Sequence, residues 1–271
     1  MKRATPPSQK ASPDVTTHVR RSLLFLLVSV PLTFVAYRGA SVIGLAAPIA
    51  VALTLFLLTA LSLKQERRSL GELGLSWRSE IASRFALGLV AGSLLFLLAA
   101  LILRGLMPFH WEQNRTVFLG AVASTFLWHL VTNTCEELAF RGYAFDGLIR
   151  SIGHWYAQLI VAISFAAFHF LSGWPWHVAL FSTTIGSLLF GLVFVRWRSL
   201  PAAVGVHAAW NFSRDLILGT PPGASALLRP VGLEQWSPDQ WRGARAIMVG
   251  VSLAACAALL FSIHRSKARP A

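Results

Sequence analysis

The chain has 271 residues, of which 55% are hydrophobic and only 13% are charged. A soluble domain of this length usually carries about twice that charged fraction, so the composition argues against a soluble enzyme and indicates one polytopic membrane domain. The net charge of +13 is not accompanied by a basic surface interleaved with exposed aromatic residues, and we therefore expect no nucleic-acid partner.

Several apolar runs reach the roughly 20 residues that cross a hydrocarbon core of about 30 Å. Backbone groups inside a bilayer must pair internally, and barrel-type alternation is absent from the sequence, so these spans should be helices. We predict an all-α, polytopic integral membrane fold of about eight transmembrane helices. The predicted spans are Ser22–Tyr37, Ser41–Leu63, Phe85–Leu103, Thr116–Arg150, Trp155–Leu171, Trp176–Val195, Leu200–Leu218 and Ala246–His264.

The polar ends of the chain frame this membrane domain. Residues 1–21 are basic and polar, and we expect a disordered cytoplasmic tail followed by an uncleaved first span. Residues 22–264 are predicted to form a single transmembrane domain with its functional core at about 116–218. Residues 265–271 are predicted to form a second cytoplasmic tail.

The basic residues predict the orientation of the chain, because cytoplasmic loops of membrane proteins collect lysine and arginine. With eight spans and both termini in the cytoplasm, most of the 24 lysines and arginines lie on the inner side. The charged stretch Lys64–Arg84 is then an interfacial helix or turn at the cytoplasmic surface. The stretch Gly219–Arg245 lies on the opposite side, with its tryptophans at the headgroup level. We expect a multi-pass protein of the bacterial inner (plasma) membrane.

Ionisable residues inside the predicted spans are the most informative feature, because each costs roughly 2.5–3.5 kcal/mol at mid-bilayer and most are functional. Glu137 and Arg141 are four residues apart, share a helix face and are expected to pair. Glu136 points about 100° away and has no basic residue three or four positions further on. Its partner must therefore come from another helix.

Helix geometry suggests which residues meet Glu136. A turn is predicted at residues 152–153, and Glu136 and His169 lie almost symmetrically about it. In an antiparallel hairpin they would have the same depth, about 20 Å along each helix. His207 and Asn211 are four residues apart and share a face of a later span. We therefore predict one buried site that contains all four side chains.

This set of residues points to hydrolysis. Glu136 and His169 could activate a water molecule, while His207 and Asn211 could stabilise an oxyanion. Glu136, His169 and His207 also match a His2Glu ligand set for Zn²⁺, although the sequence has no HExxH motif, so metal dependence stays open. His129, seven residues before Glu136, could share its face, but we interpret it as a core histidine.

Three motifs occur in order within the predicted spans: EELAFR (Glu136–Arg141), FAAFH (Phe165–His169) and HAAWN (His207–Asn211). Together they resemble the CPBP family of intramembrane endopeptidases, which includes CAAX proteases, bacteriocin-processing proteins and abortive-infection proteins. The resemblance covers about Leu63 to Leu218, including a GELGL stretch before the core.

The resemblance implies an eight-helix fold that cleaves a peptide bond near the membrane surface. The implied substrate is a membrane protein or a lipidated peptide, such as a prenylated or CAAX-like carboxyl terminus. The family is described both as metalloproteases and as glutamic proteases. The implied roles are catalytic glutamate for Glu136, water activation for His169, oxyanion hole for His207 and Asn211, and structural support for Glu137 and Arg141.

Two other classes of protein are compatible with the buried residues. A non-catalytic membrane scaffold or bacteriocin-immunity protein could keep the same fold and polar network for partner binding. A small transporter could use the glutamate and histidines as a proton relay, although no two-fold repeat with broken helices is evident. The substitution Glu136→Gln separates them: a protease loses cleavage, a scaffold keeps its partner and a relay loses pH-coupled flux.

Overall fold

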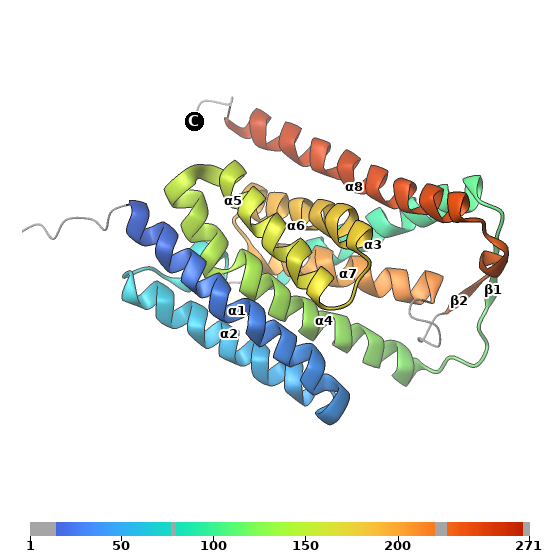
Figure 1. Cartoon of the computed structure of the whole chain (residues 1–271), viewed down its shortest axis with the longest axis horizontal. Helices are drawn as coiled ribbons and strands as arrows, with labels where there is room; N and C mark the ends of the chain where they lie inside the picture. Colours follow the sequence, from blue (N-terminus) through green and yellow to red (C-terminus); the bar gives the residue numbers. More distant parts are fainter. Residues whose placement is uncertain (1–14, 77–79, 220–226, 268–271) are drawn as a thin grey trace, which may run out of the picture.

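A computed structural model describes residues 15–76, 80–219 and 227–267. Within these ranges the chain forms a bundle of eight α-helices (Figure 1). Their bounds are α1 Val15–Ile43, α2 Ala46–Gln65, α3 Glu80–Leu106, α4 Leu119–Arg141, α5 Tyr143–Leu171, α6 Thr184–Trp197, α7 Leu200–Leu218 and α8 Pro238–Lys267. The all-α prediction is confirmed.

The connections between helices contain a few short elements. Leu70–Leu73 and Leu233–Gln235 are 3₁₀ turns, and Val178–Thr183 is a π-helical turn that leads into α6. Two short strands, β1 (His110–Gln113) and β2 (Leu228–Val231), pair antiparallel and join the two loops at one end of the bundle. The sequence analysis did not predict these strands.

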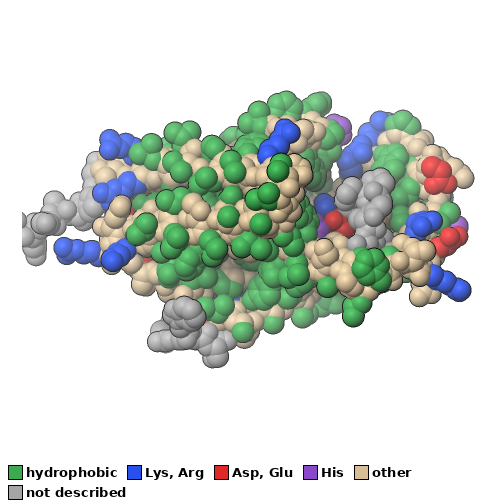
Figure 2. Space-filling view, turned by 90° about the horizontal axis from the view of Figure 1, so that it is seen from below, with side chains coloured by type: hydrophobic (Ala, Val, Ile, Leu, Met, Phe, Trp, Pro, Cys, Tyr) green, Lys and Arg blue, Asp and Glu red, His purple; other side chains and the backbone are tan. Residues whose placement is uncertain are grey.

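The outer surface of the bundle is apolar, as lipid contact requires. Large side chains such as Leu27 on α1, Leu53 on α2 and Leu94 on α3 are each at least 60% exposed. Figure 2 shows apolar side chains over the middle of the molecule and many of the charged ones toward its two ends. Among the described residues, six stretches are long and apolar enough to cross a membrane, and one of them contains both α4 and α5. The chain is an integral membrane protein.

Helix α7 is not among those six stretches because it is the buried centre of the bundle and carries polar residues. It packs closely on α3, where glycines take the place of side chains. A Cβ atom at Gly88 or Gly92 of α3 would lie 2.4 Å from a carbonyl oxygen of α7, and one at Gly205 of α7 would lie 2.5 Å from a carbonyl oxygen of α3. Such small-residue contacts are typical of helix packing in membranes.

The chain reverses direction at Gly153, whose φ of 81° and ψ of 162° interrupt α5. This confirms the predicted turn at residues 152–153. The fourth predicted span, Thr116–Arg150, is too long for one straight crossing, and the structure divides it: α4 ends at Arg141, and the non-helical Gly142 separates it from α5. A Cβ atom at Gly142 would lie 2.5 Å from the carbonyl oxygen of Leu138, so glycine suits the break.

The ends of the chain differ in part from the prediction. Helix α1 begins at Val15, so the predicted tail of residues 1–21 is helical over its last seven residues. The remainder of that tail, residues 1–14, lies outside the described residues, as do residues 268–271 of the predicted second tail. The stretch Lys64–Arg84 forms the end of α2, a 3₁₀ turn and the start of α3, apart from residues 77–79, which are also outside.

Candidate active site

A polar cavity of about 290 Å³ lies among α4, α5, α7 and the start of α6, with one side chain from α1 at its edge. All four residues that the sequence analysis grouped together, Glu136, His169, His207 and Asn211, line this cavity. The fold therefore brings together side chains from three helices, as the hairpin geometry predicted. Their catalytic roles stay predictions.

Helical periodicity explains why α7 contributes so much to the cavity. His207, Asn211 and Asp215 are spaced four residues apart, so they form one stripe along the helix. This stripe faces α4, whose residues Asn133 and Glu136 are three positions apart and line the same cavity. Each helix thus turns a polar edge toward the other inside an apolar bundle.

His207 is held by a buried carboxylate. Its Nδ1–H donates to Oε1 of Glu137 over 2.8 Å, and the same oxygen accepts a hydrogen bond from Arg141 over 3.1 Å. The ring also stacks on Phe190, with the ring centres 4.0 Å apart. These contacts fix the orientation of the imidazole and turn its Nε2 toward Glu136, whose Oε2 is 3.8 Å away.

Arg141 anchors this arrangement to two further helices. Its guanidinium donates to the hydroxyl of Ser187 on α6 over 2.8 Å and lies 4.5 Å from the ring centre of Phe165 on α5. Arg141 and Glu137 are both completely buried. The predicted pair Glu137–Arg141 is therefore present, and the same Glu137 oxygen also contacts His207.

Glu136 has one occupied and one available oxygen. The phenol of Tyr37 on α1 donates a short hydrogen bond to Oε1. Oε2 is buried and has no hydrogen-bond partner within the described residues, since 3.8 Å to His207 is too long for one. Tyr37 was not predicted as a site residue, because nothing in the sequence relates it to a glutamate 99 positions away.

His169 lines the cavity, but within the described part of the chain it forms no hydrogen bond or ion pair with Glu136. Its Nδ1–H donates to the carbonyl oxygen of Phe165, one turn earlier, over 2.9 Å. That bond assigns the proton to Nδ1 and leaves Nε2 as an acceptor. Glu136 and His169 also line a second, smaller cavity of about 210 Å³ that extends between α1 and α5. The two residues thus share a space rather than a hydrogen bond.

Asn211 is joined to a residue that the sequence analysis did not select. Its side-chain amide donates to Oδ1 of Asn133 over 3.1 Å, while the amide nitrogen of buried Asn133 has no partner among the described residues. A primary amide has two donors, so Asn211 keeps one for a ligand. The available signal for Asn133 was its position one helical turn before Glu136 and Glu137.

His129 is buried, as its interpretation as a core histidine requires, and it also lines the cavity. Its Nε2–H donates to Oδ2 of Asp215 over 2.7 Å, and Arg214 donates to Oδ1 of the same carboxylate over 2.9 Å. The four-residue step from Asn211 to Asp215 was the sequence signal that could have indicated this pair. His129 and Asp215 form the far end of the polar stripe.

The zinc hypothesis gains no support from this geometry. Within the described residues, no group of three or more His, Cys, Asp and Glu side chains is arranged to hold a metal ion. His207 is committed to Glu137 through one nitrogen, and His169 is separated from Glu136. We therefore derive no step through a metal.

The fold and cavity define a polytopic membrane protein with a buried carboxylate, two histidines and an amide around one space. Residues 118–213 match the family model described as type II CAAX prenyl endopeptidase Rce1-like, and this range contains all four predicted site residues. The matched range is about a third of the chain; the match is consistent with a CPBP family CAAX protease and supports intramembrane endopeptidase activity. No match was found among curated proteins.

Proposed function

We propose that the chain is an intramembrane endopeptidase in which Glu136 and His169 activate the water that attacks a peptide bond. The observation that carries this proposal is the buried Oε2 of Glu136, a residue that lines the cavity; this oxygen has no hydrogen-bond partner within the described residues. A buried carboxylate oxygen without a partner costs free energy, so a fold that retains one suggests a functional role.

The two residues have complementary functions in this proposal. A water molecule between Glu136 and His169 donates one proton to a carboxylate oxygen and is oriented by the acceptor Nε2 of His169. Tyr37 fixes the other oxygen of Glu136, so the carboxylate does not rotate. After attack on the carbonyl carbon, the proton held by Glu136 passes to the leaving amine.

His207 and Asn211 are the proposed oxyanion donors. Glu137 accepts from Nδ1 of His207, and a proton on Nε2 then makes that nitrogen a donor toward the cavity. With His207 doubly protonated, Glu136, Glu137, Arg141 and His207 sum to zero charge, which suits a site of low dielectric constant. Asn211 supplies the second donor through its remaining N–H.

The proposed substrate reaches the site from the side opposite the basic end of the bundle. The residues around the two site cavities include Arg38 at the end of α1, Trp174 after α5 and Arg214 near the end of α7. The opposite end holds the start of α1 and the ends of α2, α6 and α8, where most basic residues lie. If that basic end is cytoplasmic, the cavity faces the non-cytoplasmic side.

A cysteine-labelling experiment tests this orientation. Trp176 is 62% exposed in the loop beyond α5 and lies outside the two site cavities, whereas Gln65 is exposed at the end of α2. In intact cells a membrane-impermeant maleimide should label Trp176→Cys and should label Gln65→Cys only after permeabilisation. The native Cys135 and Cys256 are buried and provide a low background. The reverse pattern would contradict the proposed side of entry.

The activity itself is tested by comparing the termini of membrane proteins in cells that express the wild-type chain or Glu136→Ala at matched levels. New termini that depend on Glu136 would identify the substrate and support an endopeptidase. Identical termini in both strains, with any phenotype intact in the variant, would contradict catalysis and favour the non-catalytic scaffold or immunity protein.

A further inference from the structure

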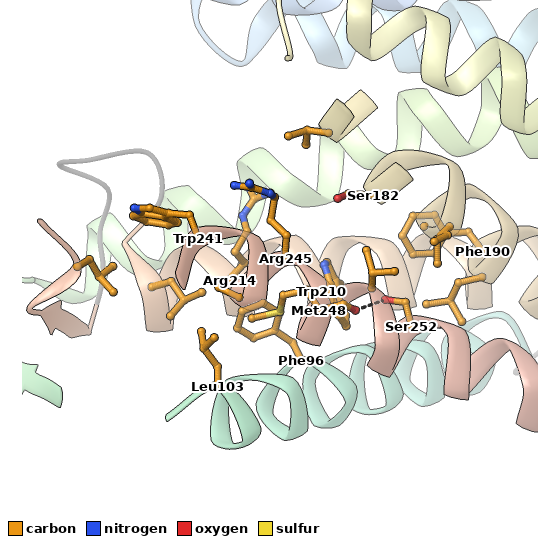
Figure 3. A pocket seen from close by; sticks show the side chains of 18 of the residues that line it. Phe96, Leu103, Ser182, Phe190, Trp210, Arg214, Trp241, Arg245, Met248 and Ser252 are labelled. Carbon is orange, nitrogen blue, oxygen red and sulfur yellow. Dashed lines mark hydrogen bonds between the residues drawn. The ribbon is translucent and has the colours of Figure 1, made fainter. Parts of the chain in front are cut away.

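An apolar cavity, distinct from the two that Glu136 and His169 line, lies beside the candidate active site. It has a volume of about 280 Å³, and its walls come from α3, α6, α7 and α8 (Figure 3). Most of its lining is apolar, including Phe96, Leu189 and Met248. It shares five lining residues with the polar cavity, so the two spaces adjoin: Ser182, Gly186, Phe190, Trp210 and Arg214.

Two arginines mark one end of this apolar cavity. Arg214 of α7 and Arg245 of α8 both line it, and in Figure 3 their guanidinium groups lie toward the same end, with Trp241. Arg214 is paired with Asp215 over 2.9 Å. Arg245 has no hydrogen bond or ion pair with any other described residue. Asp215 pairs with Arg214 but not with Arg245, so this end of the cavity carries an excess positive charge that is complementary to an anion.

The depth of this end in the membrane is indicated by tryptophans. Trp236 and Trp241 line the same cavity, with ring centres 5.0 Å apart, and Nε1 of Trp236 donates to the carbonyl oxygen of Pro108. Tryptophan is enriched at the headgroup level of membrane proteins. The arginines are thus placed where lipid phosphates lie, and the apolar lining extends from there toward the bilayer interior.

We infer that this cavity is a binding site for an anionic phospholipid, with its phosphate at Arg245 and Arg214 and part of one acyl chain in the apolar space. Charge complementarity favours a lipid with a net negative headgroup over a zwitterionic one, since a choline group would add a third cation. This inference is independent of peptide cleavage, because it rests on the arginines and apolar walls alone.

The test measures how lipids stabilise the purified full-length chain. Phosphatidylglycerol and phosphatidylcholine with identical acyl chains are added to detergent micelles, and the melting temperature is recorded. A ligand that binds only the folded state raises the melting temperature, and at equal concentration the ligand that binds more tightly raises it more. We expect a larger rise with phosphatidylglycerol for the wild type, and no difference between the two lipids for Arg245→Gln.

A matched control is available on the same helix. Arg242 is one turn earlier, is exposed and pairs with Asp239, and it does not line the cavity. Arg242→Gln should keep the wild-type preference for phosphatidylglycerol. If Arg245→Gln does not fold, Val249→Trp fills the apolar wall with both arginines intact and should remove the preference as well.

Three results would overturn the inference. The first is equal stabilisation of the wild type by both lipids, and the second is a preference that survives in both Arg245→Gln and Val249→Trp. The third is loss of the preference in Arg242→Gln as well, which would show a general effect of surface charge. Equal stabilisation together with altered cleavage in Arg245→Gln would instead assign the cavity to the substrate.

Discussion

Two clusters of charged residues lie inside this molecule, and they differ in how completely their carboxylates are paired. At the basic end, the buried Asp146 of α5 is contacted by the guanidinium groups of Arg68, Arg150 and Arg198. In the candidate active-site cavity, Glu136 has one oxygen bonded to Tyr37 and one oxygen without a partner among the described residues.

The same contrast extends to the neighbouring glutamates of the basic end. Both oxygens of Glu66 and both oxygens of Glu72 accept hydrogen bonds, from arginines, a tyrosine and a backbone amide. This cluster connects α1, α2, α5 and the loop after α6, so its contacts are structural. A buried carboxylate that is saturated holds helices together, whereas one that keeps a free oxygen in a cavity is available for chemistry.

The largest effect is expected from breaking the saturated cluster at Asp146. Asp146→Asn leaves three arginines around a neutral amide, and loss of one partner from a buried charge network costs about 3–5 kcal/mol. The melting temperature of the purified chain in detergent should fall substantially. Glu112→Gln, which removes an exposed partner of His110, should leave it nearly unchanged. Equal melting temperatures for the two variants would contradict the structural role.

The next effect concerns the proposed oxyanion donor. His207→Gln removes the imidazole held by Glu137, and loss of such a donor lowers cleavage by about 10²- to 10³-fold. The rate is measured on a substrate identified from the termini, at matched amounts of folded protein. His177→Gln, in the loop outside the cavity, should retain full activity. Unchanged cleavage by His207→Gln would remove this residue from the mechanism.

A smaller effect is expected at Tyr37. Tyr37→Phe deletes one hydrogen bond to a charged carboxylate, worth about 1.5–3 kcal/mol, so cleavage should fall by about 10- to 10²-fold. Tyr156→Phe, which changes an exposed tyrosine of α5, provides the matched control. A wild-type rate in Tyr37→Phe would show that Glu136 is oriented without the phenol.

The smallest effect is a dependence of stability on acid pH at the basic end. Burial tends to raise the pKa of Glu66 and Glu72, but hydrogen bonds outweigh it and hold each pKa below the usual value of about 4.5. The donors include Tyr143 and Arg68 for Glu66, and the backbone of Ser69 and Arg68 for Glu72. A carboxyl group with a lowered pKa stabilises the folded state above its unfolded pKa.

Because both pKa values are lowered in the folded state, the effect falls in a specific pH window. The contribution of both glutamates should be complete above about pH 4.5 and should be lost as the pH falls through their lower folded-state values. The melting temperature in detergent should therefore decline below pH 4.5, and the decline should be shallower in the double variant Glu66→Gln and Glu72→Gln. An identical decline in both proteins would assign the acid sensitivity to other groups.

Short-range patterns in the sequence predicted much of the site. The four-residue spacing of Glu137 and Arg141 predicted their pairing, and the symmetric positions of Glu136 and His169 about Gly153 placed them in one cavity. These inferences succeeded because helix geometry relates residues within one helix or one hairpin. The sequence also predicted the all-α membrane fold, because the length of each apolar run can be read directly from the order of the residues.

Contacts between helices far apart in the sequence could not be predicted in the same way. Tyr37 and Glu136 are on helices whose relative rotation depends on packing, so no spacing rule connects them. Two of the three arginines around Asp146, Arg68 and Arg198, come from distant loops, and positive charge near the predicted cytoplasmic face had a simpler explanation in topology. The break at Gly142 was missed because an apolar run continues across it.

The most direct test of the contrast compares Glu136→Gln with Asp146→Asn in one pair of assays. Each purified variant is measured for its melting temperature and for cleavage of a substrate identified from the termini, per folded molecule. The account predicts that Glu136→Gln loses cleavage by at least about 10²-fold with a near wild-type melting temperature. Asp146→Asn should show a large loss of melting temperature with cleavage retained. Cleavage retained by Glu136→Gln would contradict the central claim.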